Sequence, residues 1–186
     1  MKRFFLLVAT LAIGMTVYAQ QHMTFKGVEI NGTTSEMVNK LVNAGFEDIG
    51  QSEYNDLYYL KGNFAGYDAT IAVVPTVKGV VHSVAAEYRE GLLNWSLAIE
   101  RFNALEKNLS KKYGIPTVQN KDISGYSDGT TLIRNNKGEW SSSWFLEKGK
   151  ITLSIFVTQS YVLHVHLVYT DKINKLAAEQ QAYDDL

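Results

Sequence analysis

Two stretches of the chain carry hydrophobic residues at the spacing of three and four that an amphipathic helix requires. Before the first stretch, Thr33 and Glu36 stand at capping-box spacing, and Gly45 follows it. Asn94 precedes the second, longer stretch, and Gly114 follows it. The apolar stripe of the second stretch consists of Trp95, Ala98, Ile99, Phe102, Leu105, Leu109 and Tyr113. The pattern therefore predicts two helices, each with a polar cap at its start.

Hydrophobic and polar residues alternate with a period of two in strand-like runs after each helix. These runs cover residues 57–64, 67–74 and 80–89 in the first half, and 140–147, 150–157 and 161–170 in the second. Asp171 is placed to cap a short closing helix that extends to Tyr183. The pattern predicts an α+β fold of two tandem repeats, each a helix plus an antiparallel three-strand meander, with the helices packed on one face of the sheet.

The repeats divide the chain at residues 93 and 94. The first helix-and-meander repeat spans 20–93, and the second spans 94–186 together with the closing helix. No linker rich in Pro, Gly or Ser separates them. We therefore expect one cooperative unit.

The alternation also assigns the two faces of the sheet, because neighbouring strand residues point to opposite sides. Trp140, Trp144 and Leu146 are predicted to point into the core. The predicted outward face contains Tyr59, Ser143, Phe145, Thr152, Ser154, Phe156, His164 and His166. A two-residue turn at 159–160 would break this alternation, so we expect an odd-length loop or a bulge there. Two phenylalanines on a polar face need a cover, which is either the closing helix folded back or an external partner.

The first residues have the pattern of a secretory signal peptide. Lys2 and Arg3 give a positive start, an apolar run continues to Val17, and small residues precede Gln20. The run is shorter than the roughly 20 residues that a bilayer crossing requires. We expect cleavage after residue 19 and an exported protein, periplasmic or secreted, without a membrane span after cleavage.

Composition narrows the classes of function. The formal net charge is −1 and the chain has no cysteine. A near-neutral chain lacks the basic surface that nucleic-acid binding requires, so we expect no nucleic acid among its partners. Without cysteine, the chain cannot form a disulfide, a thiol nucleophile or a lipid anchor on cysteine. No cofactor motif is present, and we expect no cofactor.

The signal sequence and the tandem helix-plus-meander order resemble the fold of the β-lactamase inhibitor proteins and related periplasmic modules. The Val17-Tyr18-Ala19-Gln20 segment is similar to the signal ends of exported proteins of Bacteroidetes. The chain departs from the inhibitor family because it lacks the cysteines that form disulfides there. The resemblance covers most of the mature chain, implies an α+β fold, and carries over no functional residue.

Two short patterns suggest chemistry. Residues 125–129 match the G-x-S-x-G nucleophile elbow, but their polar flanks favour an ordinary turn, and we expect Ser127 to be non-catalytic. His164 and His166 stand two apart on a predicted strand, so both imidazoles point to one side, where they are weak candidates for metal ligands. A third ligand would depend on the sheet geometry, with Glu87, Asp68 and His82 as the candidates. We expect no metal site.

Two functions of different classes remain. The first is an exported, non-catalytic binding or inhibitory module that contacts a protein or a small ligand through the outward sheet face. The second is a small metal-dependent or hydrolytic periplasmic enzyme that uses His164 and His166. The mixture of aromatic and small polar residues on the outward face favours the first.

Overall fold

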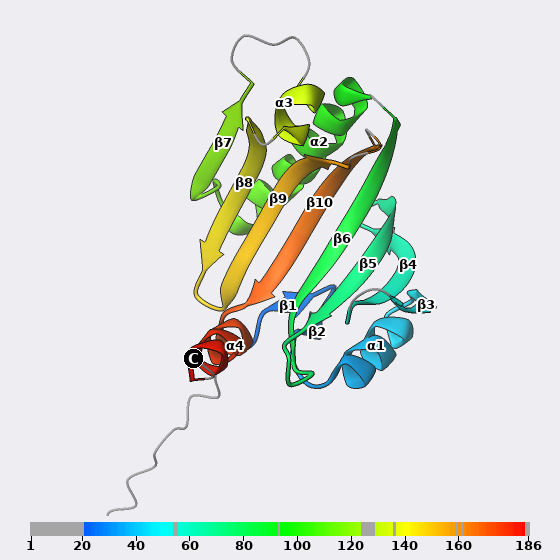
Figure 1. The fold of residues 1–186 in the computed structure, drawn as a ribbon, viewed down its shortest axis with the longest axis vertical. Helices are drawn as coiled ribbons and strands as arrows, with labels where there is room; N and C mark the ends of the chain where they lie inside the picture. The colour runs from blue at the N-terminus through cyan, green and yellow to red at the C-terminus, as the bar shows by residue number, and fades with distance from the viewer. Residues whose placement is uncertain are drawn as a thin grey trace, which may run out of the picture.

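The computed structural model of the chain describes residues 21–53, 56–92, 94–123, 129–135, 137–158, 160 and 162–184. The strands are β1 (Thr24–Phe25), β2 (Val28–Glu29), β3 (Glu47–Gln51), β4 (Tyr58–Phe64), β5 (Tyr67–Pro75), β6 (Val81–Leu92), β7 (Val118–Asp122), β8 (Glu139–Leu146), β9 (Gly149–Val157) and β10 (Val162–Asp171). The helices are α1 (Thr34–Asn43), α2 (Trp95–Tyr113), α3 (Thr130–Arg134) and α4 (Lys172–Asp184). Figure 1 shows their arrangement.

Eight of the strands form one antiparallel sheet in the order β3-β4-β5-β6-β10-β9-β8-β7, and β1 and β2 form a separate hairpin. Each half of the chain contributes four successive strands, and the halves join where β6 pairs with β10. The predicted fold of two helix-plus-three-strand repeats is therefore wrong. The strand-rich sheet contains β3 and β7, which the alternation did not indicate.

The missed strands are the two edges of the sheet. The residues of β3 and β7 are mostly polar and mostly exposed, since each strand pairs on one side only and has little apolar surface to bury. Glu106 of α2 holds β7 in place: its carboxylate accepts hydrogen bonds from Lys121 Nζ at 2.7 Å and Gln119 Nε2 at 2.9 Å. Such an edge strand depends on residues outside the strand itself, here 13 and 15 positions away, so alternation within it could not indicate it.

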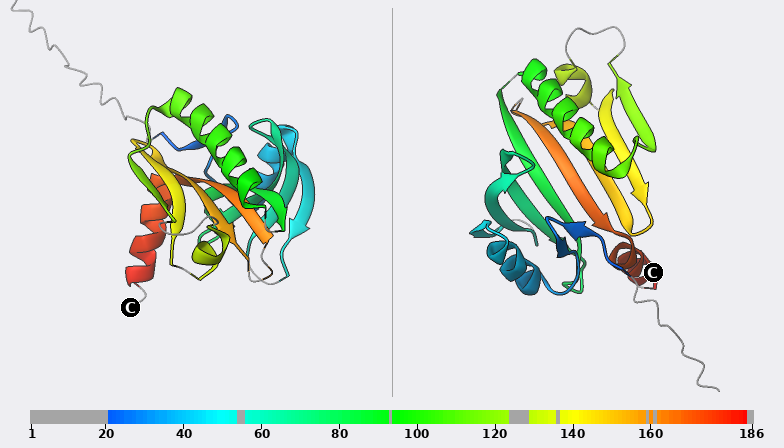
Figure 2. Two further views of the ribbon diagram at one scale, coloured as in Figure 1. Left: turned by 90° about the horizontal axis from the view of Figure 1, so that it is seen from above. Right: turned by 180° about the vertical axis from the view of Figure 1, so that it is seen from behind.

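The helices do not all lie on one face of the sheet, which also corrects the prediction. Seen from behind in Figure 2, α1 and α2 lie in front of the sheet. By contrast, α4 borders a groove together with Phe145, Thr152 and Thr170, whose side chains belong to the opposite face. The helix α4 starts at Lys172, directly after the last residue of β10, and the view from above in Figure 2 shows it on the other side of the sheet from α2.

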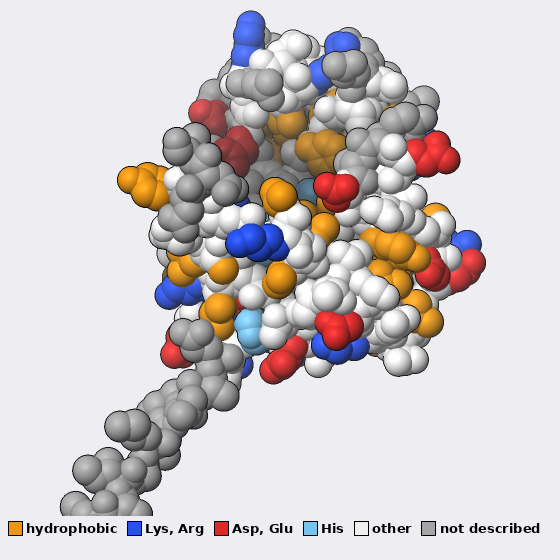
Figure 3. All heavy atoms as spheres, turned by 60° about the horizontal axis from the view of Figure 1, so that its bottom comes forward, with side chains coloured by type: hydrophobic (Ala, Val, Ile, Leu, Met, Phe, Trp, Pro, Cys, Tyr) orange, Lys and Arg blue, Asp and Glu red, His pale blue; other side chains and the backbone are white. Residues whose placement is uncertain are grey.

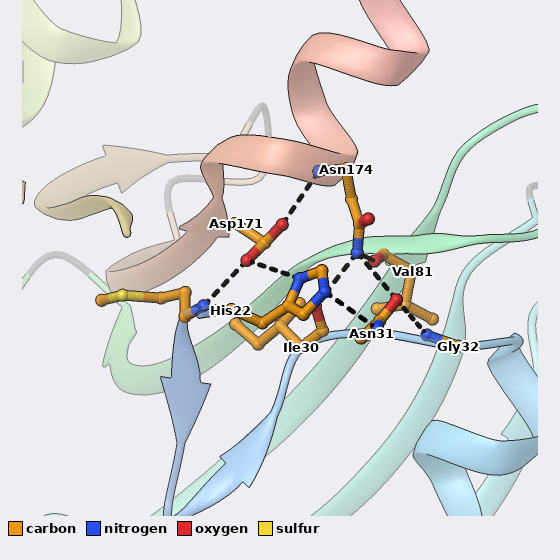
Figure 4. A network of polar contacts seen from close by, with 8 residues as sticks. His22, Ile30, Asn31, Gly32, Val81, Asp171 and Asn174 are labelled. Atoms are coloured by element: carbon orange, nitrogen blue, oxygen red, sulfur yellow. Dashed lines mark hydrogen bonds and ion pairs between the residues drawn. The ribbon is translucent and has the colours of Figure 1, made fainter. Parts of the chain in front are cut away.

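A network of buried polar groups fixes the position of α4 (Figure 4). The fully buried Asp171 accepts hydrogen bonds from the backbone N–H of Asn174 at 2.8 Å and of Met23 at 2.7 Å. The Asn174 side chain donates to the carbonyl oxygens of Ile30 at 3.1 Å and Val81 at 2.9 Å. The closing helix, the N-terminal hairpin and the start of β6 are thus joined at one point.

One hydrophobic core lies between the sheet and the helices α1 and α2. It includes Leu41 of α1 and Phe102 of α2, and Trp144 is buried in it with 1% of its surface exposed. The inward direction predicted for Trp144 is confirmed, and its indole N–H donates to the carbonyl oxygen of Gly114 at 2.9 Å. The three predicted caps are also confirmed: α1 begins with a capping box, the Asn94 side chain caps α2, and the Asp171 carboxylate caps α4.

The described residues contain no helix that is both long enough and apolar enough to cross a membrane. The predicted signal peptide, residues 1–19, lies outside the described residues. Its assignment stays a prediction.

Candidate functional site

The candidate site is the outward face, which we define as the face of the eight-stranded sheet opposite α1 and α2. In Figure 1 the middle of this face is seen directly, with α3 near one end and α4 at the other. The register places its residues in rows that cross the strands. One row runs Lys61, Thr70, Glu87, His166, Ser154, Ser141 and Asn120, from β4 to β7.

The predicted alternation on β9 and β10 is confirmed by this register. Val165 pairs with Ile155, and His164 pairs with Phe156, so histidine and phenylalanine share the outward face. Val157 pairs with Leu163, so five residues, 158–162, lie between the last paired positions. This odd number keeps the apolar positions of both strands on one face, as predicted.

Four side chains from three adjacent strands form a central cluster: Glu87 of β6, Phe156 of β9, and His164 and His166 of β10. The ring of Phe156 stacks on His164 with centroids 4.8 Å apart and meets His166 at 5.5 Å. The Nδ1 atom of His164 lies 2.6 Å from Oε1 of Glu87. The Glu87 side chain retains 36% exposure, so this carboxylate is accessible from outside.

The environment of the cluster affects the charge of His166. Burial lowers the pKa of His166 below its usual range; the Glu87 carboxylate raises it in part, and the neighbouring His164 lowers it. Loss of hydration disfavours the imidazolium form, which explains the direction. At neutral pH His166 is therefore an uncharged imidazole, able to donate one hydrogen bond and to accept another.

Small hydroxyl side chains extend the outward face toward the β7 edge. The Oγ atom of Ser143 and the Oγ1 atom of Thr152 lie 3.3 Å apart. Glu139 accepts from the Ser141 hydroxyl at 2.5 Å and from Asn120 Nδ2 at 3.0 Å. These groups form a polar margin beside the central cluster.

The structure does not bring all the predicted site residues together. Phe156, His164 and His166 are in contact, and Ser154 pairs with His166 in the register. Tyr59 lies on β4, four strands from Thr152 along one row, which is roughly 19 Å at the usual strand spacing. Phe145 lies at the α4 end, beside Lys150.

The covering of the two phenylalanines was left open by the sequence. Phe145 is 56% exposed, whereas Phe156 is half-buried against the histidines. The helix α4 packs against β6, β9 and β10 near the Asp171 end of β10, and it forms one wall of a groove beside Phe145. It therefore does not cover the central cluster.

Sequence reasoning missed Arg89 as part of this face. Arg89 pairs with His164 in the register, and with Glu87, Lys61 and Asp68 it lines a depression of about 580 Å³ between the cluster and the β3 edge. The alternation of Glu87 and Arg89 along β6 was a signal that could have indicated both.

Figure 3 shows hydrophobic side chains and a histidine at the bottom of a hollow, with acidic side chains beside it.

Glu87 is the one candidate third ligand that the structure brings to the His pair. His82 lies five residues from Glu87 along β6, roughly 16 Å away in an extended strand. Among the described residues, no group of three His, Asp or Glu side chains is arranged to hold a metal ion. Ser127 and its G-x-S-x-G pattern lie outside the described residues, apart from Gly129.

Comparisons with protein-family models, with curated proteins and with solved structures found no match to this chain. The resemblance to the β-lactamase inhibitor fold therefore stays a prediction.

Proposed function

We propose that the protein is exported and acts as a non-catalytic binding or inhibitory module whose outward face contacts a protein partner. One observation carries this proposal: on the outward face, Phe156 contacts both His164 and His166, and Glu87 contacts His164. His164 is buried, whereas Phe156, His166 and Glu87 remain partly exposed. Packing between these side chains restricts their rotamers before any partner arrives. A surface ordered in this way loses less conformational entropy on binding.

The chemistry of the cluster and its margins suits protein recognition. Aromatic and arginine side chains contribute strongly at interfaces, and here Phe156 and Arg89 flank the paired His164. The hydroxyl groups of Ser143 and Thr152 supply hydrogen-bonding capacity around this centre. A partner with an apolar side chain surrounded by hydrogen-bonding groups would match this surface.

Capture from the exported proteome with purified protein tests the proposal. The variant carries Phe156→Ala and His166→Ala, and the matched control carries Val77→Ala and Ile115→Ala, which remove apolar side chains that are 96% and 88% exposed away from the cluster. We expect a saturable partner that the wild type and the control retain and the cluster variant loses. Urea unfolding must show that the variant is folded.

Retention of every partner by a folded cluster variant would refute the outward face as the binding surface. Hydrogen exchange with the captured partner adds an independent measurement, since slowed exchange should map to β9 and β10. Slowed exchange confined to α1 and α2 would place the interface on the other side of the molecule.

The alternative enzyme function has one supporting feature. Ser154, His166 and Glu87 lie in one row across three adjacent strands, the residue types of a hydrolytic triad. Yet the contact given by the structure joins Glu87 to His164. We expect no ester hydrolysis in an esterase assay and no stoichiometric zinc binding in calorimetry. Ester hydrolysis that Ser154→Ala abolishes, or zinc binding that His164→Ala abolishes, would favour the enzyme.

A further inference from the structure

A second concave surface lies where α4 meets the sheet, at the opposite end of the outward face from α3. This α4 groove encloses about 560 Å³ and is lined by Phe145, Leu146, Gly149, Lys150, Thr152, Thr170, Lys172, Lys175 and Leu176. Its volume lies within the range of about 300–1,000 Å³ that is typical of small-molecule sites.

Two large apolar side chains in the α4 groove face water. Phe145 of β8 is 56% exposed and Leu176 of α4 is 53% exposed. They come from elements far apart in the sequence but line the same groove. An apolar ligand between them would remove both surfaces from water, at about 25 cal/mol for each Å² buried.

The charge of the α4 groove has one sign. Lys150, Lys172 and Lys175 line it, and the lining contains no acidic residue. Lys175 makes an ion pair with Glu179 at 3.5 Å, but both side chains are about half-exposed, so water competes with this pair. The Lys150 ammonium lies 5.1 Å from the centre of the Phe145 ring, which places a cation directly beside the apolar wall.

The geometry of α4 groups the cations with the apolar wall. Lys172, Lys175 and Leu176 stand at spacings of three and four along the helix, so they share one side of it. In Figure 3, which brings the α4 end of the molecule forward, hydrophobic side chains lie among those of basic residues on the near surface. The groove therefore combines an apolar floor with a positive margin.

We infer that the α4 groove binds an amphiphilic anion, a monocarboxylate with an aliphatic tail of the fatty-acid type. The tail packs between Phe145 and Leu176, and the carboxylate lies among the ammonium groups of Lys150, Lys172 and Lys175. Lysine stems are themselves apolar, so the side chains can cover the tail while the charged ends hold the head group. This site is separate from the central cluster and does not rest on the proposed function.

Calorimetric titration with dodecanoate below its micelle concentration tests the inference. Dodecyltrimethylammonium, with the same tail and the opposite charge, and acetate, with the head group alone, are the ligand controls. We expect saturable binding of one dodecanoate per chain and at least about tenfold weaker binding of either control, because the groove recognises both parts of the ligand.

Variants locate the site. Lys150→Gln/Lys175→Gln and, separately, Leu176→Ser should each weaken dodecanoate binding at least about fivefold, a loss of roughly 1 kcal/mol. The matched controls are Lys40→Gln/Lys111→Gln and Ile115→Ser, which change the same residue types elsewhere on the surface, and they should bind like the wild type. All the substituted side chains except Lys150, which is half-buried, are exposed, so folding should persist in every variant.

Several outcomes would overturn the inference. These are equal binding of the cationic amphiphile, unsaturable binding, or equal weakening in the control variants. The Phe156→Ala/His166→Ala variant should keep dodecanoate binding. Failure of protein capture in an otherwise dodecanoate-binding protein would count against the proposed function alone. Failure of dodecanoate binding in a protein that captures its partner would count against the α4 groove alone.

Discussion

Two pairs of histidine and carboxylate lie in different regions of the molecule and differ in the burial of the carboxylate. At the N-terminal hairpin, the Nδ1 atom of His22 lies 3.2 Å from Oδ2 of Asp171 (Figure 4). On the outward face, His164 lies 2.6 Å from Glu87. Asp171 is fully buried, whereas the Glu87 side chain is 36% exposed.

The difference lies in what else each carboxylate does. The oxygens of Asp171 also accept two backbone N–H groups, from Met23 and Asn174, so its hydrogen-bonding capacity serves the fold. Glu87 keeps part of its surface in water. A buried carboxylate with several protein donors stabilises the structure, whereas a half-exposed one can exchange its contacts.

The largest expected effect is on the buried pair. Asp171→Ala should lower the free energy of unfolding by about 3–5 kcal/mol, because it leaves two buried N–H groups unsatisfied and removes the cap of α4. Urea unfolding monitored by circular dichroism measures the loss. Glu179→Ala, on the exposed side of the same helix, is the control and should change stability by less than about 0.5 kcal/mol. A loss below about 1 kcal/mol for Asp171→Ala would show that the network is not structural.

The Asn174 amide should contribute somewhat less. Asn174→Ala leaves the carbonyl oxygens of Ile30 and Val81 without their donor, at a cost of about 1–3 kcal/mol in urea unfolding. Asn174→Asp keeps the shape but replaces the donor with acceptor oxygens, so it should destabilise at least as much. If Asn174→Asp has wild-type stability, the donated hydrogen bonds do not matter.

His166, beside the outward pair, gives the molecule a pH dependence. Burial lowers the pKa of His166, so this histidine binds a proton more readily in the unfolded chain than in the folded one. The folded state is therefore favoured above a pH of about 6.5, where His166 is neutral in both states, and it loses this stability as the pH falls further. Urea unfolding at pH 7.5 and 5 should show this loss, and His166→Gln should reduce it. Burial, with Lys175, also lowers the pKa of His82, so a His82→Gln variant separates the two contributions. An unchanged pH dependence in His166→Gln would contradict the assignment.

The smallest effect on stability is expected at Glu87. Glu87→Gln should change the free energy of unfolding by less than about 1 kcal/mol, since the side chain is partly hydrated in the folded state. The same change removes a negative charge that raises the pKa of His166, so this pKa should fall further in NMR titration. An upward shift would show that Glu87 does not act on His166.

Local patterns along the chain determined the elements that bury an apolar face. The helices α1 and α2, their caps at Thr33 and Asn94, and the alternation that sends Trp144 inward and Phe145 outward were all predictable. These features depend on residues at most four positions apart, and they bury enough surface to leave a periodic signal.

Only the tertiary structure decided which outward residues meet. The pairing of β6 with β10 brings Glu87 to His164, and the β4 position of Tyr59 separates it from the other predicted site residues. The polar edge strands β3 and β7 each pair with the next strand along the chain, β4 and β8, but bury too little apolar surface to leave a periodic signal. The position of α4 follows from the bonds of Asp171 to Met23 and of Asn174 to Val81, which join residues more than 90 positions apart in sequence. Periodicity records the face on which a residue lies but not its neighbours across strands, because strand order depends on how the whole sheet assembles.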